Sequence, residues 1–145
     1  MAVHGARPRG VLLVAGILLF AAVMVAVYWI LFFSGTPALS GVACYVTFET
    51  AFPAADTWLA VTALVGAIGL FARKSWGVLF ALLAGSASIF LGLMDVLYDS
   101  LNGIYGRLFS AAGTDVAVEI AINVLTLVLG PIIIWYVWTR RRSLL

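Results

Sequence analysis

The fold is decided by the stretch Gly10–Phe33, which reads GVLLVAGILLFAAVMVAVYWILFF and contains no charged residue. A helix needs about 20 apolar residues to cross the hydrocarbon core of a bilayer. The stretch is longer than the apolar part of a cleavable signal peptide, which has about 7–15 residues. We therefore expect it to be a retained membrane anchor.

Three more stretches of this kind follow. We predict four transmembrane helices, at Gly10–Phe33, Pro53–Ala72, Trp76–Tyr98 and Val116–Trp138. Because proline suits the first turn of a helix, the second helix should begin near Pro53, or kink there if Val46–Phe52 is already helical. The prediction is an all-α, polytopic transmembrane four-helix bundle, a single domain over residues 1–145.

The composition excludes most other classes of protein. Of the 145 residues, 65% are hydrophobic and 10% are charged, against about 25% charged in soluble proteins. The single cysteine, Cys44, excludes a disulfide scaffold and the paired-cysteine chemistry of membrane quinone oxidoreductases. The sequence has no glycine-rich phosphate loop, and nothing in it supports nucleic-acid binding.

The basic residues predict the orientation. Only Arg107 lies on one side of the four-helix topology; the other seven basic residues lie on the opposite side and are Arg7, Arg9, Arg73, Lys74, Arg140, Arg141 and Arg142. Since basic residues mark the cytoplasmic side, we expect both termini in the cytoplasm. The excess of arginine over lysine suggests a GC-rich bacterial genome, and hence a multi-pass protein of the bacterial inner or plasma membrane. The two longer outer loops, 34–52 and 99–115, should contain short helices.

All six acidic residues lie toward the outer side. At about 1.5 Å per helical residue, Asp56, Asp95 and Glu119 lie about 25–31 Å from the inner ends of their helices. They are therefore near the outer boundary of a hydrocarbon core about 30 Å thick. Charged groups at such depths normally face the bundle interior or a wet cavity, so we expect these three carboxylates to form a cluster.

Further polar residues extend this cluster. Glu49 and Asp99 form a second tier of candidate ligands, and Asn102 and Asn123 continue polar stripes on the last two helices. Like charges held together do not all remain ionised without help. Three arrangements remain open: a bound cation or proton, a structural polar network closed by Arg107, or side chains that only reach out to the interface.

The candidate ligands indicate which cation would bind. Carboxylate and amide oxygens suit hard divalent cations such as Ca²⁺, Mg²⁺ or Mn²⁺, whereas zinc prefers imidazole or thiolate ligands. His4 lies on the predicted inner side, and Cys44 has no second cysteine beside it. A hard divalent cation is the one cofactor that the sequence indicates.

The third predicted helix carries small residues at steps of four, three and four, namely Ala81, Gly85, Ser88 and Gly92. Such a stripe permits close approach of a neighbouring helix. We expect it to pack within the molecule, with Gly66 and Gly69 of the second helix facing it. Only Arg73–Ser75 separate these two helices, which predicts a tight antiparallel hairpin.

Three segments carry a resemblance to a known family. FPAADTWL at Phe52–Leu59, IFLGLMD at Ile89–Asp95 and NGIY at Asn102–Tyr105 resemble small bacterial four-helix membrane proteins of unknown function. The resemblance covers about Glu49–Tyr105, which is the middle two helices. It implies the same four-helix fold, attaches no activity and carries over no functional residue.

The leading functional hypothesis is a small membrane protein that binds a cation or proton at its outer end, in contact with the lipid bilayer. Below Asp56, Asp95 and Glu119 the helices offer no second acidic site, so a monomer should bind without conducting. The alternative is an integral-membrane enzyme of the lipid or isoprenoid isomerase type, with paired carboxylates as acid and base.

That enzyme would need an apolar pocket beside Asp95 and Glu119, lined by Phe90, Met94 or Trp58. A further alternative is an accessory subunit of a larger membrane complex. A homo-oligomer is compatible with each of these functions.

Overall fold

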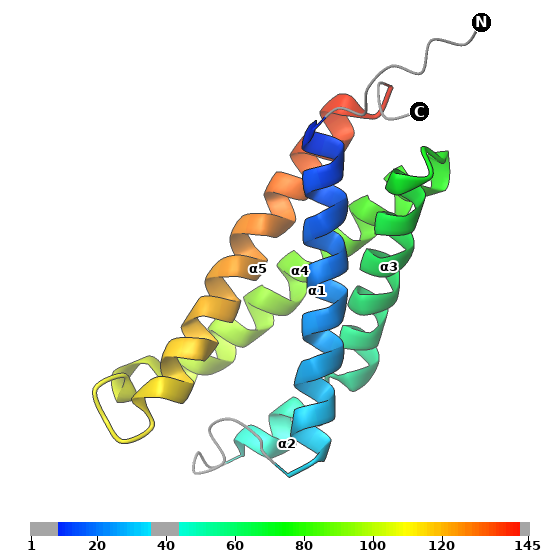
Figure 1. Cartoon of the computed structure of the whole chain (residues 1–145). Helices are drawn as coiled ribbons and strands as arrows, with labels where there is room; N and C mark the ends of the chain where they lie inside the picture. The colour runs from blue at the N-terminus through cyan, green and yellow to red at the C-terminus, as the bar shows by residue number, and fades with distance from the viewer. Residues whose placement is uncertain (1–8, 36–43, 143–145) are drawn as a thin grey trace, which may run out of the picture.

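The structure is a computed structural model that describes residues 9–35 and 44–142. In these residues it contains helices and no strand. The elements are α1 (Arg9–Phe33), α2 (Tyr45–Glu49), α3 (Pro53–Phe71), α4 (Ser75–Leu101), the 3₁₀ helix η1 (Tyr105–Arg107) and α5 (Gly113–Arg140) (Figure 1). The helices α1, α3, α4 and α5 are long and apolar enough to cross a membrane.

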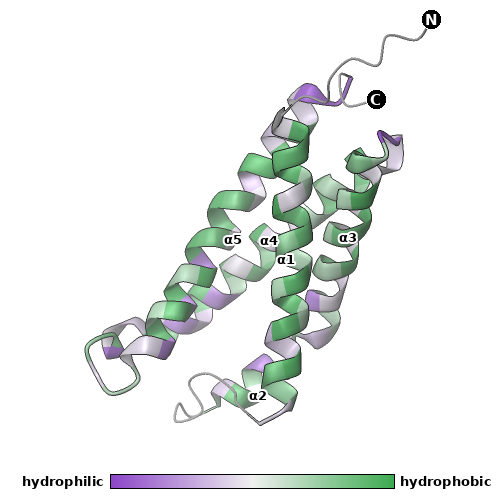
Figure 2. Cartoon of the chain, in the orientation of Figure 1, coloured by the Kyte–Doolittle hydropathy of each residue, from purple (hydrophilic) through white to green (hydrophobic). Residues whose placement is uncertain are grey.

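The long helices pack in chain order: α1 against α3, α3 against α4, and α4 against α5. Helix α1 begins and α5 ends at one end of the bundle, where the α3–α4 turn also lies, whereas α2 lies at the opposite end (Figure 1). We call the first the basic end, since Arg73, Lys74 and Arg140 lie there, and the other the acidic end. Hydrophilic residues are concentrated toward the two ends of the bundle (Figure 2).

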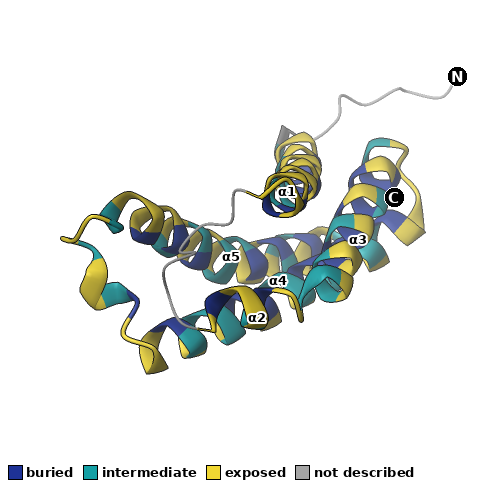
Figure 3. Cartoon of the chain, turned by 90° about the horizontal axis from the view of Figure 1, so that it is seen from below, coloured by how far each residue is buried: buried dark blue, intermediate teal, exposed yellow. Residues whose placement is uncertain are grey.

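The outer faces of the long helices are apolar. Large hydrophobic side chains of α1 are mostly uncovered, with Leu13 at 65%, Phe20 at 61% and Ile30 at 69% exposure. Exposed residues run along the outward surfaces of all four long helices (Figure 3). An apolar surface of this extent is unstable in water but matches the acyl chains of a bilayer.

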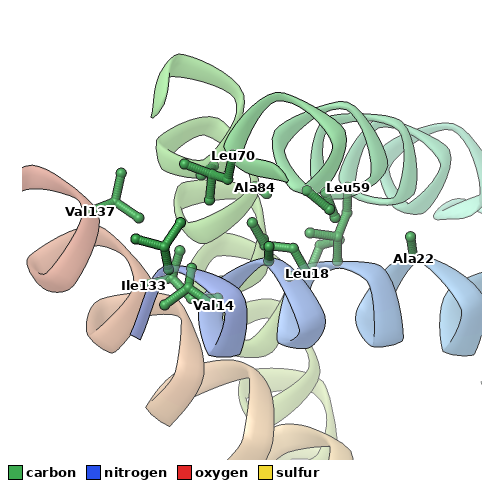
Figure 4. Close-up of a cluster of buried hydrophobic side chains, with 14 residues drawn as sticks. Val14, Leu18, Ala22, Leu59, Leu70, Ala84, Ile133 and Val137 are labelled. Atoms are coloured by element: carbon green, nitrogen blue, oxygen red, sulfur yellow. The ribbon is translucent and has the colours of Figure 1, made fainter. Parts of the chain in front are cut away.

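Small aliphatic side chains fill the interior of the bundle (Figure 4). The labelled members of this core are Val14, Leu18 and Ala22 of α1, Leu59 and Leu70 of α3, Ala84 of α4, and Ile133 and Val137 of α5. Helix α1 therefore meets α5 as well as α3 in the half of the bundle near the basic end. The small size of these side chains lets the helix backbones approach closely.

The predicted hairpin of α3 and α4 is confirmed, and it has a glycine contact. The backbones of Gly69 and Gly77 lie directly against one another, so that a Cβ on either residue would overlap backbone atoms of the other. The turn between the helices needs Arg73 at a φ of 53°. Lys74 N–H then reaches back to the Gly69 carbonyl at 2.9 Å and closes the end of α3.

The stripe of small residues on α4 packs within the molecule, as we expected, and it is shared between two neighbours. Ala81 packs against Gly66 of α3. The other three residues, Gly85, Ser88 and Gly92, pack against α5. The reason is that α4 crosses behind α1 at an angle, lying beside α3 in its first half and beside α5 in its second.

Four long apolar helices lie in the predicted regions, but α4 and α5 extend further toward the acidic end than hydropathy indicated. Helix α4 continues to Leu101 and α5 already begins at Gly113. Helix α3 starts at Pro53, as predicted, and the preceding residues form the separate helix α2, which ends at Glu49. Glu49 and Asp56 therefore do not share one helix face. Each of the two longer connections contains a short helix, α2 or η1.

Candidate functional site

Two carboxyl groups at the acidic end accept hydrogen bonds from α1. The Tyr28 hydroxyl donates to Glu49 Oε2 at 2.7 Å. The Trp29 indole Nε1 donates to Asp56 Oδ2 at 2.9 Å. Consecutive helical side chains point about 100° apart, so that Tyr28 reaches α2 while Trp29 reaches α3.

A second polar group joins α4, η1 and α5. Asn123 Nδ2 donates to Asp99 Oδ2 at 2.8 Å and to the Tyr105 hydroxyl at 3.0 Å. Asp99 is 1% exposed and Asn123 is 3% exposed. The fully buried Ile104 lies immediately before η1 and anchors this short helix where Tyr105 meets α5.

Helix α2 brings a tyrosine to the acid of α5. The Tyr45 hydroxyl donates to Glu119 Oε2 at 3.4 Å, and both residues are buried. Tyr45 packs beside Val116, and Phe48 stacks on the ring of Tyr98 with 3.7 Å between the ring centroids. These contacts hold α2 against α4 and α5, so α2 supplies both an acid and a donor to the site.

Three buried polar atoms in this region have no hydrogen-bond partner within the part of the chain that the structure describes. They are the Tyr98 hydroxyl, Oδ1 of Asp99 and Oδ1 of Asn123. A buried acceptor left without a donor costs about 1–3 kcal/mol. Native structures contain few such groups, and each calls for a physical explanation.

Burial changes the titration of the groups that lie outside the membrane-spanning helices. It raises the pKa of Glu49 above the ordinary value of 4.5, even though a hydrogen bond acts in the opposite direction. Burial, with the neighbouring Glu119 carboxylate second, raises the pKa of the Tyr45 hydroxyl. For the Tyr105 hydroxyl, burial and then the Asp99 carboxylate raise the pKa. Both tyrosines therefore remain hydrogen-bond donors, and burial shifts the titration of Glu49 toward its neutral form.

The remaining predicted site residues lie at the margin. Asp95 is half-buried on α4. Asn102 is exposed and donates to the Tyr98 carbonyl at 2.9 Å, which places it at the end of α4 and outside the buried groups. Arg107 is exposed, and within residues 9–35 and 44–142 no ion pair joins it to a carboxylate.

The carboxyl groups that we predicted as metal ligands hydrogen-bond to donors on different helices. Among the described residues, no group of three or more histidine, cysteine, aspartate and glutamate side chains is placed to hold one metal ion. Glu49 and Asp56 bind donors of α1, whereas Asp99 and Glu119 bind donors of α5 and α2.

An apolar groove of about 410 Å³ lies between α4, η1 and α5. Its wall includes Val96, Tyr105, Ile120, Asn123, Val124 and Leu127. None of Phe90, Met94 and Trp58 lines it, so this groove is not the pocket that the isomerase hypothesis specified.

The residues that sequence analysis missed are the aromatic donors Tyr28, Tyr45 and Tyr105. Tyrosine and tryptophan near helix ends are typical of the membrane interface, and that role by itself does not indicate a contact with an acid. The sequence does contain a signal for them. Every buried carboxyl group needs a donor, and Arg107 is the one basic residue on the predicted outer side, so the donors had to be neutral side chains.

Comparison of the chain with protein families, with curated proteins and with solved structures finds no match. The functional reading of the site therefore depends on its geometry.

Proposed function

We propose that this multi-pass membrane protein binds protons in the buried carboxyl groups of its acidic end, and that a monomer does so without conducting ions. The supporting observation is that Glu49, Asp99 and Glu119 are each less than 10% exposed and are hydrogen-bonded by neutral donors. A buried carboxylate without a cation is costly, and taking up a proton removes that cost.

The orientation completes the proposal. The basic end carries Arg73, Lys74 and Arg140–Arg142, and the positive-inside rule assigns such an end to the cytoplasm. In a bacterial cell membrane, the acidic end would then lie on the side away from the cytoplasm. Its protonation would follow the pH outside the cell.

A hard divalent cation, Ca²⁺, Mg²⁺ or Mn²⁺, is the competing occupant of the same carboxyl groups. It would need at least one carboxyl to exchange its tyrosine or asparagine donor for the ion. Exchange would break the hydrogen bonds to Glu49 and Asp99, at 2.7 and 2.8 Å, whereas a proton can bind without breaking them.

The test is thermal unfolding in detergent from pH 4 to 8, for the natural protein, Glu49→Gln and Glu119→Gln, with exposed Asp115→Asn as the matched control. Since the pKa of Glu49 is raised by folding, its stabilising contribution is fully present below 4.5 and is lost as the pH rises through the raised value. We expect the melting temperature to fall with rising pH, less steeply in Glu49→Gln and Glu119→Gln, and unchanged in slope in Asp115→Asn.

Equal slopes in all four proteins would contradict the proposal. A rise in melting temperature on adding millimolar Ca²⁺, Mg²⁺ or Mn²⁺, lost in both glutamine variants and kept in Asp115→Asn, would assign the site to a divalent cation instead.

A further inference from the structure

The buried pair of Asp99 and Asn123 contains two oxygen atoms that can only accept. One hydrogen bond joins the residues, from Asn123 Nδ2 to Asp99 Oδ2 at 2.8 Å. The two atoms beside this bond, Asp99 Oδ1 and Asn123 Oδ1, have no partner among the described residues. At 1% and 3% exposure, neither side chain is solvated by bulk water.

We infer that a single proton resides on Oδ1 of Asp99 and is shared with Oδ1 of Asn123. A carboxylic acid and a primary amide are complementary: the amide N–H donates to one acid oxygen, and the acid O–H donates to the amide oxygen. One proton therefore gives both unpartnered oxygens a bond and removes a buried charge. This inference rests on the proposed proton-binding function and names the group that holds the proton.

The titratable groups around the pair are acids and phenols. They are Glu119 of α5, Glu49 of α2, Tyr105 of η1, and Asp95 and Tyr98 of α4. The two side chains that hydrogen-bond Asp99 or face it most closely, Asn123 and Tyr105, are neutral. None of these groups carries a positive charge that would stabilise an ionised Asp99, and burial of the pair penalises that charge.

The shared proton also has a mechanical role. Asp99 lies two residues before the end of α4, and Asn123 lies in the outer part of α5, so the pair connects the two helices beyond their glycine contacts. Asn123 uses a second bond to hold Tyr105 of η1. Loss of the proton leaves both Oδ1 atoms without a partner beside a buried charge among the described residues, which loosens α4, α5 and η1 together. The pair is thus a proton-dependent latch at the acidic end.

Infrared spectroscopy of the protein in lipid vesicles tests this directly, because a protonated carboxyl group has a carbonyl band well separated from that of a carboxylate. At pH 6 we expect such a band, a component of it that shifts on labelling the aspartate carboxyl carbons with ¹³C, and the loss of that component in Asp99→Asn. Exposed Asp115→Asn is the matched control and should keep it. In Asn123→Leu, which removes the shared acceptor, the band should shift or disappear.

The stability of Asp99→Asn gives a second readout. An asparagine at this position forms the same two bonds with Asn123 at any pH, so the variant should match or exceed the melting temperature of the natural protein at pH 8. A protonated band that is insensitive to aspartate labelling would overturn the inference, while leaving proton binding by Glu49 or Glu119 intact. The absence of any protonated carboxyl band would overturn both. Because labelling uses the natural sequence, the test does not depend on a variant that folds.

Discussion

At the scale of single residues, the carboxyl groups of the acidic end accept hydrogen bonds from aromatic side chains, each of which is largely apolar and donates one hydrogen bond. Tyr28, Trp29 and Tyr45 each cover a carboxyl group with a ring and direct a single O–H or N–H at it. A charged donor in this place would add a second desolvation cost of several kcal/mol. A neutral aromatic donor satisfies the acid and leaves its protonation free to change.

The first prediction concerns Tyr28→Phe, which deletes the donor to Glu49 Oε2. A hydrogen bond to an ionised group contributes about 1.5–3 kcal/mol, and one between neutral groups about 0.5–1.5 kcal/mol. We therefore expect the variant to lower the free energy of unfolding at both pH 8 and pH 4.5, and more at pH 8. Reversible unfolding in mixed micelles at the two pH values measures this. Tyr136→Phe, at the basic end, is the control, and an equal loss at both pH values in Tyr28→Phe would refute the assignment.

At the scale of elements, α2 and α4 position the site. Helix α2 has five residues, far fewer than a helix needs to be stable alone, and its side chains Tyr45 and Phe48 fix it by packing on α4 and α5. Helix α4 is the central element, since it packs against both α3 and α5. The register of α3 against α4 is set where Gly69 meets Gly77.

The second prediction is that Gly77→Ala destabilises the protein, because its Cβ would overlap the backbone of Gly69. Overpacking of this kind costs about 1–3 kcal/mol. Gly16→Ala is the matched control, since a Cβ there meets nothing within 4 Å, and alanine improves helix propensity by up to about 1 kcal/mol. Thermal unfolding of the two variants measures the difference. A Gly77→Ala protein as stable as Gly16→Ala would show that α3 and α4 do not touch at this point.

At the scale of the whole molecule, charge is separated along the bundle, with basic residues at one end and buried acids toward the other. This separation predicts the orientation in the membrane. It also limits transport, because the core between the acidic groups and the basic end is formed by aliphatic side chains.

The third prediction uses Cys44, the only cysteine of the chain, which is exposed beside α2. In intact cells a membrane-impermeant maleimide should label it from outside, since the acidic end faces away from the cytoplasm in our proposal. Labelling only after the membrane is permeabilised would reverse the orientation. A variant that combines Cys44→Ser with Ser75→Cys, at the start of α4, should be labelled only after the membrane is permeabilised.

The fourth prediction is that the monomer conducts no ions. We would reconstitute the protein in liposomes at one copy per vesicle. Gradients of H⁺, Na⁺, K⁺ and Ca²⁺ across these vesicles should then decay at the same rate as in empty vesicles. The physical reason is that a bare charge in the aliphatic core of the four helices costs several kcal/mol. Flux that scales with a monomeric preparation would contradict this, whereas flux confined to cross-linked oligomers would assign conduction to an assembly.

Local sequence features are enough to predict that the protein is helical and has four helices long and apolar enough to cross a membrane. Apolar runs such as Gly10–Phe33 leave a helix as the one backbone form that satisfies its own hydrogen bonds in lipid, and Pro53 suits the first turn of the helix that begins there. The antiparallel hairpin of α3 and α4 is likewise predicted by the short connection Arg73–Ser75 alone. These features depend on local chemistry and length, which one sequence contains in full.

Only the tertiary structure decided how the polar groups are paired. The hydrogen bonds of Tyr28 to Glu49, Tyr45 to Glu119 and Asn123 to Asp99 join residues 21, 74 and 24 positions apart. Helical periodicity fixes which residues share a face, but not which face meets which neighbour, nor that α4 divides its small-residue stripe between α3 and α5. Those choices depend on helix crossing angles, and crossing angles are set by the packing of all the helices at once.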